Sequence, residues 1–314
     1  MIWFGSRASG LALGWLWLGS VSSAETIPMT RAEQHGLVCD EMAAAPYDPR
    51  RRPGTPGVEL DKIDADAVFT CERALMPNPG DAQRLYQLGR AQIAAGNADA
   101  GLVSIRQAQI KGYATANYDL AVFYIASTVP EHRAEAVKLM WAAAEAGVVP
   151  AMRDMGTFYY AGTGISQDRA EARLWFEKAA AAGDEFAGLL LGLMLKNGEG
   201  GPKDPKRARE SLKAAATYGE IRAMNAYAVM LDSGEGGPKR QKEARSWFLK
   251  AAEAGDVDAM VNLGTRLTTS RGGPRDLKGA RFWLGKAAAA GDAGAAEMLA
   301  ELDKLQAKRS PKRN

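Results

Sequence analysis

The sequence predicts an all-α protein, a right-handed superhelical solenoid built from stacked α/α helix pairs. Three observations support this prediction. Six glycines recur at a nearly constant spacing, an alanine stands four residues after each of them, and most intervals between them contain a glycine-rich turn. The composition agrees, because β-branched residues are scarce and Ala, Leu, Lys, Arg and Glu, which favour helices, are abundant.

The glycines define the period of the repeat. From Gly147 onward they are 36 residues apart, and the first interval is 35 residues. The glycines are Gly112, Gly147, Gly183, Gly219, Gly255 and Gly291, and the alanines are Ala116, Ala151, Ala187, Ala223, Ala259 and Ala295. A fixed period of this length indicates repeated units, each of which buries its apolar face only against its neighbours.

Each unit is predicted to hold two helices. In unit 219–254 the first helix has apolar residues at helical spacing, such as Tyr227 and Leu231, and it ends at a glycine-rich turn that closes on Pro238. The second helix carries a large aromatic residue and ends at the next period glycine. We assign Trp141, Trp175, Trp247 and Trp283 to one column of these second helices and expect all four to be buried packing residues.

The combined pattern A-x-x-x-L-G, G-x-G and D-x-x-x-A-x-x-W-[FL]-x-K-A-A-x-x-G resembles the Sel1-like repeat, a relative of the tetratricopeptide repeat. The resemblance covers about three quarters of the chain and suggests its division. Five Sel1-like units are expected at 112–146, 147–182, 183–218, 219–254 and 255–290, after a tetratricopeptide-like half-unit and repeat at 63–111 and before a capping helix and basic tail at 291–314.

The first 24 residues have the composition of an export signal. Arg7 precedes the apolar run 11–18, and small residues end at Ala24. A membrane-spanning helix needs ~20 apolar residues, about twice the length of this run, so we expect cleavage after Ala24 rather than a retained anchor. The mature protein would then be periplasmic or secreted, without a membrane span.

Residues 25–62 lie outside the repeats and are rich in proline and glycine, which predicts an extended cap or linker rather than a folded domain. Export implies an oxidising compartment, so Cys39 and Cys71 are expected to form a disulfide, although two unrelated thiols remain the alternative. The bond would pin the segment onto the first repeat helix, either as a cap over the end of the solenoid or as a functional latch.

The sequence contains no recognisable catalytic or metal-binding constellation. Its two histidines, His35 and His132, fall in different contexts, and an oxidised Cys39 would not serve as a nucleophile for His35. The glycine-rich turns follow helices, whereas a phosphate loop follows a strand. We therefore expect no catalytic residue, no metal and no cofactor. A formal charge of +3 gives no indication of a nucleic-acid partner.

The remaining candidate is a binding surface. In tetratricopeptide-like solenoids the first helices line the concave face, and the resemblance places side chains three, six, ten and thirteen positions after the period glycine on it. Tyrosine and arginine are favoured anchors of protein interfaces. The candidate partner-binding residues are Tyr86, Arg90, Tyr118, Arg153, Tyr160, Lys196, Arg222, Asn225 and Asp232.

The resemblance implies an exported, monomeric scaffold that binds a protein or peptide partner in the cell envelope, in signalling or host contact. One alternative is a cell-wall or glycan-binding module, which would need tryptophan or tyrosine on an exposed face. Another is a secreted protein that binds or hydrolyses β-lactams. Relatives linked to that activity carry a cysteine pair in each repeat, whereas this chain has no cysteine after Gly80, so we expect no enzyme.

Overall fold

The computed structural model describes residues 29–309, so the expected export signal and the end of the basic tail lie outside the described residues. Within residues 29–309 the chain forms fifteen α-helices and one 3-10 helix, with no strand. The helices are α1 Arg31–Ala43, η1 Leu60–Lys62, α2 Ala67–Leu75, α3 Ala82–Ala94, α4 Ala98–Ile110, α5 Ala114–Ile125, α6 Pro130–Glu145, α7 Val149–Ala161, α8 Arg169–Ala181, α9 Glu185–Asn197, α10 Pro205–Tyr218, α11 Ile221–Ser233, α12 Gln241–Glu253, α13 Val257–Leu267, α14 Leu277–Ala289 and α15 Ala293–Arg309.

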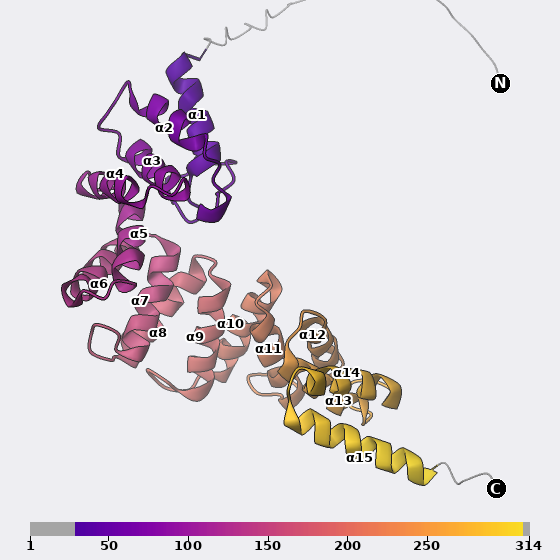
Figure 1. Cartoon of the computed structure of the whole chain (residues 1–314). Coiled ribbons are helices and arrows are strands. Elements are labelled where there is room, and N and C mark those ends of the chain that lie inside the picture. Colours follow the sequence, from indigo (N-terminus) through magenta and orange to yellow (C-terminus); the bar gives the residue numbers. More distant parts are fainter. Residues whose placement is uncertain (1–28, 310–314) are drawn as a thin grey trace, which may run out of the picture.

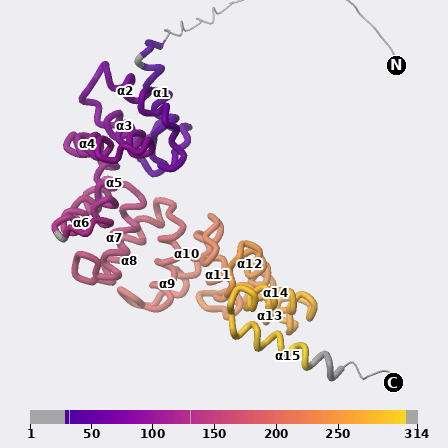
Figure 2. The backbone as a smooth tube through the Cα atoms, in the orientation of Figure 1, coloured from indigo at the N-terminus to yellow at the C-terminus, as the bar shows by residue number. Residues whose placement is uncertain are grey.

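The helices stack in consecutive pairs. From α3 to α14, each odd-numbered helix packs against the even-numbered helix that follows it, and each pair packs on the next. Figures 1 and 2 show these pairs following one another along a curved array, with α4 and α6 on the outer side of the bend. We call the odd-numbered helices first helices and the even-numbered ones second helices. The all-α solenoid predicted from the sequence is confirmed.

The period residues have the structural roles that their types suggest. All six period glycines have positive φ, a conformation that glycine adopts without steric cost, and they turn the chain from each second helix into the next first helix. The six alanines that follow them are fully buried. Because a methyl group is small, the backbones of neighbouring helices can approach closely at these positions.

The tryptophan column requires a correction. Trp175 and Trp283 are buried and Trp247 is partly buried, but Trp141 is 48% exposed. The three packed tryptophans stand eight residues before their period glycines, whereas Trp141 stands only six before Gly147. The true column residue of that unit is Leu139, which is 7% exposed. Two positions on a helix turn a side chain through about 200°, so Trp141 faces outward.

Arginine side chains join each repeat to the next. Arg173 donates a hydrogen bond to the Pro202 carbonyl at 3.1 Å, and Arg209 bonds to the Pro238 carbonyl at the same distance. Arg245 repeats the contact with the Pro274 carbonyl at 2.9 Å. Each arginine lies on a second helix, and each proline lies in the glycine-rich turn of the following unit. These bonds therefore set the register between neighbouring pairs.

The same turns approach the preceding repeat very closely. Gly236 has a φ of 74°, and a Cβ atom placed on it would lie 2.1 Å from the Pro205 carbonyl oxygen. Pro205 begins α10, the second helix of the preceding unit. Glycine is therefore required at this position both by its backbone conformation and by the contact between units.

The N-terminal segment is more structured than the sequence analysis expects. The sequence predicts an extended segment over residues 25–62, but this segment contains the 13-residue helix α1, which begins at a capping box formed by Thr30 and Glu33. This helix packs against α2 and so supplies the first helix of the half-unit to which α2 belongs. The disulfide Cys39–Cys71 joins the two helices. The irregular part of the segment, which contains most of its prolines and glycines, is limited to residues 44–59. We call these residues the N-terminal loop.

Candidate functional site

The N-terminal loop lies against the first helices α3 and α5. Arg90 of α3 donates hydrogen bonds to the Ala43 and Val58 carbonyls, at 2.9 and 2.7 Å, and so holds both ends of the loop. Asp48 accepts hydrogen bonds from Tyr113 and from Thr115, at the start of α5. The loop therefore covers the first helices at the N-terminal end of the solenoid.

A tyrosine–carboxylate cluster fastens the middle of this loop. Tyr47 donates a hydrogen bond to Asp119 of α5, and Tyr86 of α3 donates another at 2.8 Å. Burial raises the pKa of Asp119 above its ordinary value, because desolvation outweighs the two hydroxyl donors and the nearby Arg90. Burial also raises the pKa of Tyr47, so its hydroxyl stays protonated and remains a donor at neutral pH.

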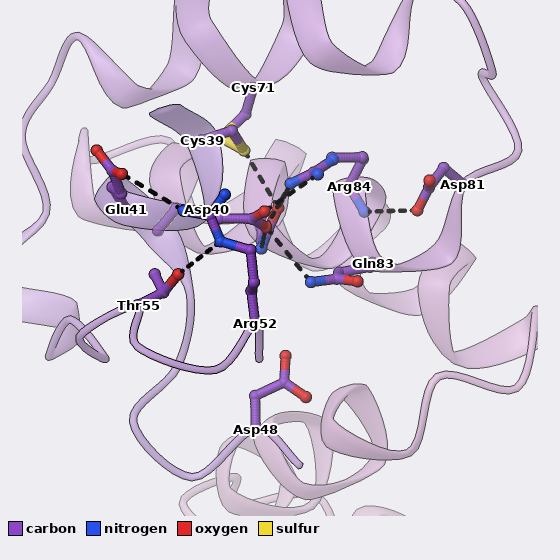
Figure 3. Close-up of polar contacts among 12 residues, drawn as sticks. Cys39, Asp40, Glu41, Asp48, Arg52, Thr55, Cys71, Asp81, Gln83 and Arg84 are labelled. Atoms are coloured by element: carbon purple, nitrogen blue, oxygen red, sulfur yellow. Dashed lines mark hydrogen bonds and ion pairs between the residues drawn. A yellow bond between two sulfur atoms is a disulfide. The ribbon is translucent and has the colours of Figure 1, made fainter. Parts of the chain in front are cut away.

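A second polar cluster anchors α1 beneath the disulfide. Asp40 forms an ion pair with Arg84 of α3 and accepts a hydrogen bond from Gln87 at 2.8 Å. Figure 3 shows Arg84 and Gln83 turned toward Asp40, beside Cys39 and Cys71. Asp40 is only 5% exposed, and its carboxylate accepts hydrogen bonds from Gln83, Arg84 and Gln87. We interpret the cluster as a structural anchor of the cap.

Several of the sequence-predicted site residues are buried or already bonded to other residues of the chain, and we call these residues occupied. Tyr86 is fully buried and Arg90 is 2% exposed, because the N-terminal loop covers them. Tyr118 packs edge-on against Tyr47 and donates a hydrogen bond to Asp154. The other occupied residues are Arg153, which is paired with Asp154 and Asp184, and Asp232, which is 8% exposed and paired with Arg266. The expectation that Tyr86, Arg90 and Asp232 line an open face is wrong for this structure.

The other four predicted residues lie on α7, α9 and α11. Tyr160 is 36% exposed, Arg222 is exposed, and Lys196 and Asn225 are half-buried. Asn225 accepts a hydrogen bond from Asn262 of the next first helix. The open part of the predicted surface therefore begins at α7, where cover by the N-terminal loop has ended.

An apolar pocket of about 250 Å³ lies in this open part. It is lined by Thr157, Tyr160, Phe176, Phe186, Leu190 and Met194. Residues of α7 form one wall and residues of α9, spaced four apart, form the other, while Phe176 of α8 is buried at 2% exposure. The pocket is therefore a cleft between two successive first helices, wide enough for an apolar side chain.

Polar and charged groups frame this pocket. Tyr160 donates a hydrogen bond to Glu199 at 2.8 Å, and the Arg169 guanidinium lies 5.3 Å from the Tyr160 ring centroid. Hydrogen bonds from Asn197 and Tyr160 lower the pKa of Glu199. On the other side, the Arg222 guanidinium lies 5.1 Å from the Phe186 ring. An apolar pocket with a polar rim is the usual anatomy of a protein-interaction site.

The apolar residues that line this pocket are not among the predicted partner-binding residues, apart from Tyr160. Phe186 stands three positions after Gly183, so the repeat rule itself assigns it to this face. Leu190 and Met194 extend the same stripe at helical spacing, but they fall between the columns used for the prediction. A stripe drawn along α9 from Phe186, rather than columns drawn across the units, would have found them.

Between residues 29 and 309 no three His, Cys, Asp or Glu side chains come close enough together to hold a metal ion. Over the same range no helix has the length and apolarity to cross a membrane.

The stacked pairs define an α/α repeat scaffold, a class of protein that presents an extended surface along its first helices. A model of the Sel1 repeat matches residues 149–184, 189–217, 221–256 and 257–292. The chain therefore carries Sel1 repeats, and its solenoid is of the Sel1, tetratricopeptide-like type. Such solenoids are generally scaffolds for protein interaction rather than enzymes.

Two solved structures share this architecture. A protective antigen of uropathogenic Escherichia coli strains, described as having an SLR fold, is 25% identical with a TM-score of 0.71. The match covers 87% of this chain but only 59% of the antigen. A Sel1 repeat protein from Oxalobacter formigenes is 26% identical with a TM-score of 0.65, over 70% of this chain and 90% of that one. No curated protein matches the sequence.

Proposed function

We propose that this chain is an exported scaffold that holds a segment of a protein partner on its first helices, at the pocket between α7 and α9. The observation that carries the proposal is the open apolar pocket bounded by Tyr160 and by Phe186 with its stacked Arg222. The leader-like residues 1–24 and the Cys39–Cys71 disulfide support a location in the periplasm or outside the cell.

The pocket suits an apolar side chain of a bound segment. Aromatic residues and arginine supply most of the binding energy in protein interfaces when they surround a desolvated centre. Lys196 and Arg222 add positive charge on α9 and α11. We therefore expect the partner segment to place an apolar anchor in the pocket and an acidic or hydrogen-bond-accepting group beside it.

The test is capture of the partner from the envelope fraction by the purified mature chain. The double variant Tyr160→Ser, Arg222→Glu is expected to retain at least tenfold less of the partner, because each anchor is worth about 2 kcal/mol or more at an interface centre. Tyr160 and Arg222 are both partly or fully exposed, so the helical circular dichroism spectrum should not change. Mass spectrometry identifies the protein retained in stoichiometric amount.

The matched control is Tyr218→Ser, Lys213→Glu on the second helix α10. It makes the same type of substitution at two exposed positions away from the pocket, Tyr218 being 73% exposed. The control should capture the partner as the unmodified chain does. Equal capture by both double variants would show that the pocket between α7 and α9 is not the binding site.

A further inference from the structure

Trp141 is an exposed tryptophan that the repeat does not use for packing. It occupies the position six residues before a period glycine, and the other units place Glu177, Lys213, Leu249 and Gly285 there. Leu139 already fills the packing column of the same helix. Leu174 of the neighbouring second helix is also exposed, at 53%. Two large apolar side chains thus lie on the outer surface of α6 and α8, where the repeat needs neither.

These residues belong to a cavity of about 400 Å³. It is lined by Trp141, Glu145, Tyr159, Glu171, Leu174, Trp175, Glu177 and Lys178. The volume falls within the range of roughly 300–1,000 Å³ that is typical of small-molecule sites. The cavity combines aromatic and aliphatic surface with carboxylates and an ammonium group, so it presents an apolar platform beside hydrogen-bonding groups.

The charges around this platform are largely paired. Glu145 binds the Lys178 ammonium at 3.2 Å, and Glu177 forms an ion pair with Arg207. Lys178 also lies 3.8 Å from the Trp175 ring centroid. A cationic ligand would find two of the three carboxylates already paired, and an anionic ligand would meet three carboxylates. A neutral ligand that both donates and accepts hydrogen bonds fits this mixed rim best.

We propose that the cavity between α6 and α8 binds a saccharide. A sugar ring has an apolar C–H face, which would lie on the exposed indole of Trp141, and hydroxyl groups at its edge. The hydroxyls would donate to the carboxylates of Glu145 and Glu171 and accept from Lys178. This site lies mainly on the second helices and shares no lining residue with the pocket between α7 and α9, so it does not depend on the proposed protein-binding function.

The test is titration of the full mature chain with chitotriose, cellotriose and maltotriose, followed by calorimetry and saturation-transfer NMR. At least one trisaccharide is expected to bind with a dissociation constant of about 1 mM or tighter, and saturation should reach its ring C–H protons. Trp141→Ala is expected to weaken that binding at least tenfold. Because Trp141 is 48% exposed and lies outside the packing column, the variant should keep its helical circular dichroism spectrum.

The matched control is Leu249→Ala, which removes an apolar side chain from the equivalent outward position of α12. It should bind the trisaccharide as the unmodified chain does. The proposal is overturned if none of the three trisaccharides binds, or if Trp141→Ala binds as tightly as the unmodified chain. Trp141-dependent binding of trilysine, without binding of any trisaccharide, would instead assign the site to a basic partner.

Discussion

Replacement of both Cys39 and Cys71 by serine is expected to lower the free energy of unfolding of the N-terminal cap by about 3–4 kcal/mol. The disulfide closes a loop with a sequence separation of 32 residues, and removing it returns that conformational freedom to the unfolded chain. The core that α1 and α2 share is small and depends largely on alanine and the two cysteines themselves. The cap should therefore loosen before the Sel1 repeats do.

Hydrogen–deuterium exchange measures this effect by region. In the serine variant, amides of α1, α2 and the N-terminal loop should exchange faster, while those of α9 to α14 keep their protection. Dithiothreitol should produce the same pattern in the unmodified chain and no further change in the variant. Unchanged protection of α1 would contradict the stabilising role of the disulfide.

The second large effect is expected from Gly236→Ala. Alanine at a φ of 74° is strained, and its Cβ would meet the Pro205 carbonyl oxygen of the preceding unit at 2.1 Å. Strain at positive φ costs about 1–3 kcal/mol, and relieving a backbone clash adds about 1–3 kcal/mol. We expect a total loss of about 2–6 kcal/mol in the free energy of unfolding, measured by urea unfolding monitored by circular dichroism.

Gly112→Ala provides a matched control for this prediction. Its φ of 78° is nearly the same, but no atom lies within 4 Å of the added Cβ. It should lose only the strain component of the free energy of unfolding. The difference between the two variants measures the contact between units, and equal losses would show that this contact contributes nothing to stability.

The repeat architecture is predictable because one spacing determines many contacts at once. A glycine that takes positive φ and an alanine that is fully buried recur on the same schedule, so their pattern reports helix packing directly. The tryptophan column shows the limit of this reasoning. Trp141 resembles its counterparts in residue type but stands two positions away from their column, and position, not type, decides which way a helical side chain faces.

The candidate site is less predictable because distant contacts shape it. Tyr47 and Asp119 are 72 residues apart in the chain, and no local pattern indicates that they meet. Their contact lets the N-terminal loop cover Tyr86 and Arg90, which the repeat rule assigns to an open face. The rule identifies the face that can bind, whereas a segment outside the repeats determines how much of it is free.

The arginine-to-proline bonds have a consequence for how this chain can change length. Each bond spans 29 residues and crosses one junction between units. Excision of residues 219–254 would bring Arg209 to the same offset from Pro274 that it now has from Pro238. After the loss or duplication of a whole unit, the same arginine-to-proline bond could therefore form at the new junction between units. Recombination at the period glycines can therefore shorten or lengthen the surface of the first helices, and no new interface between units has to evolve.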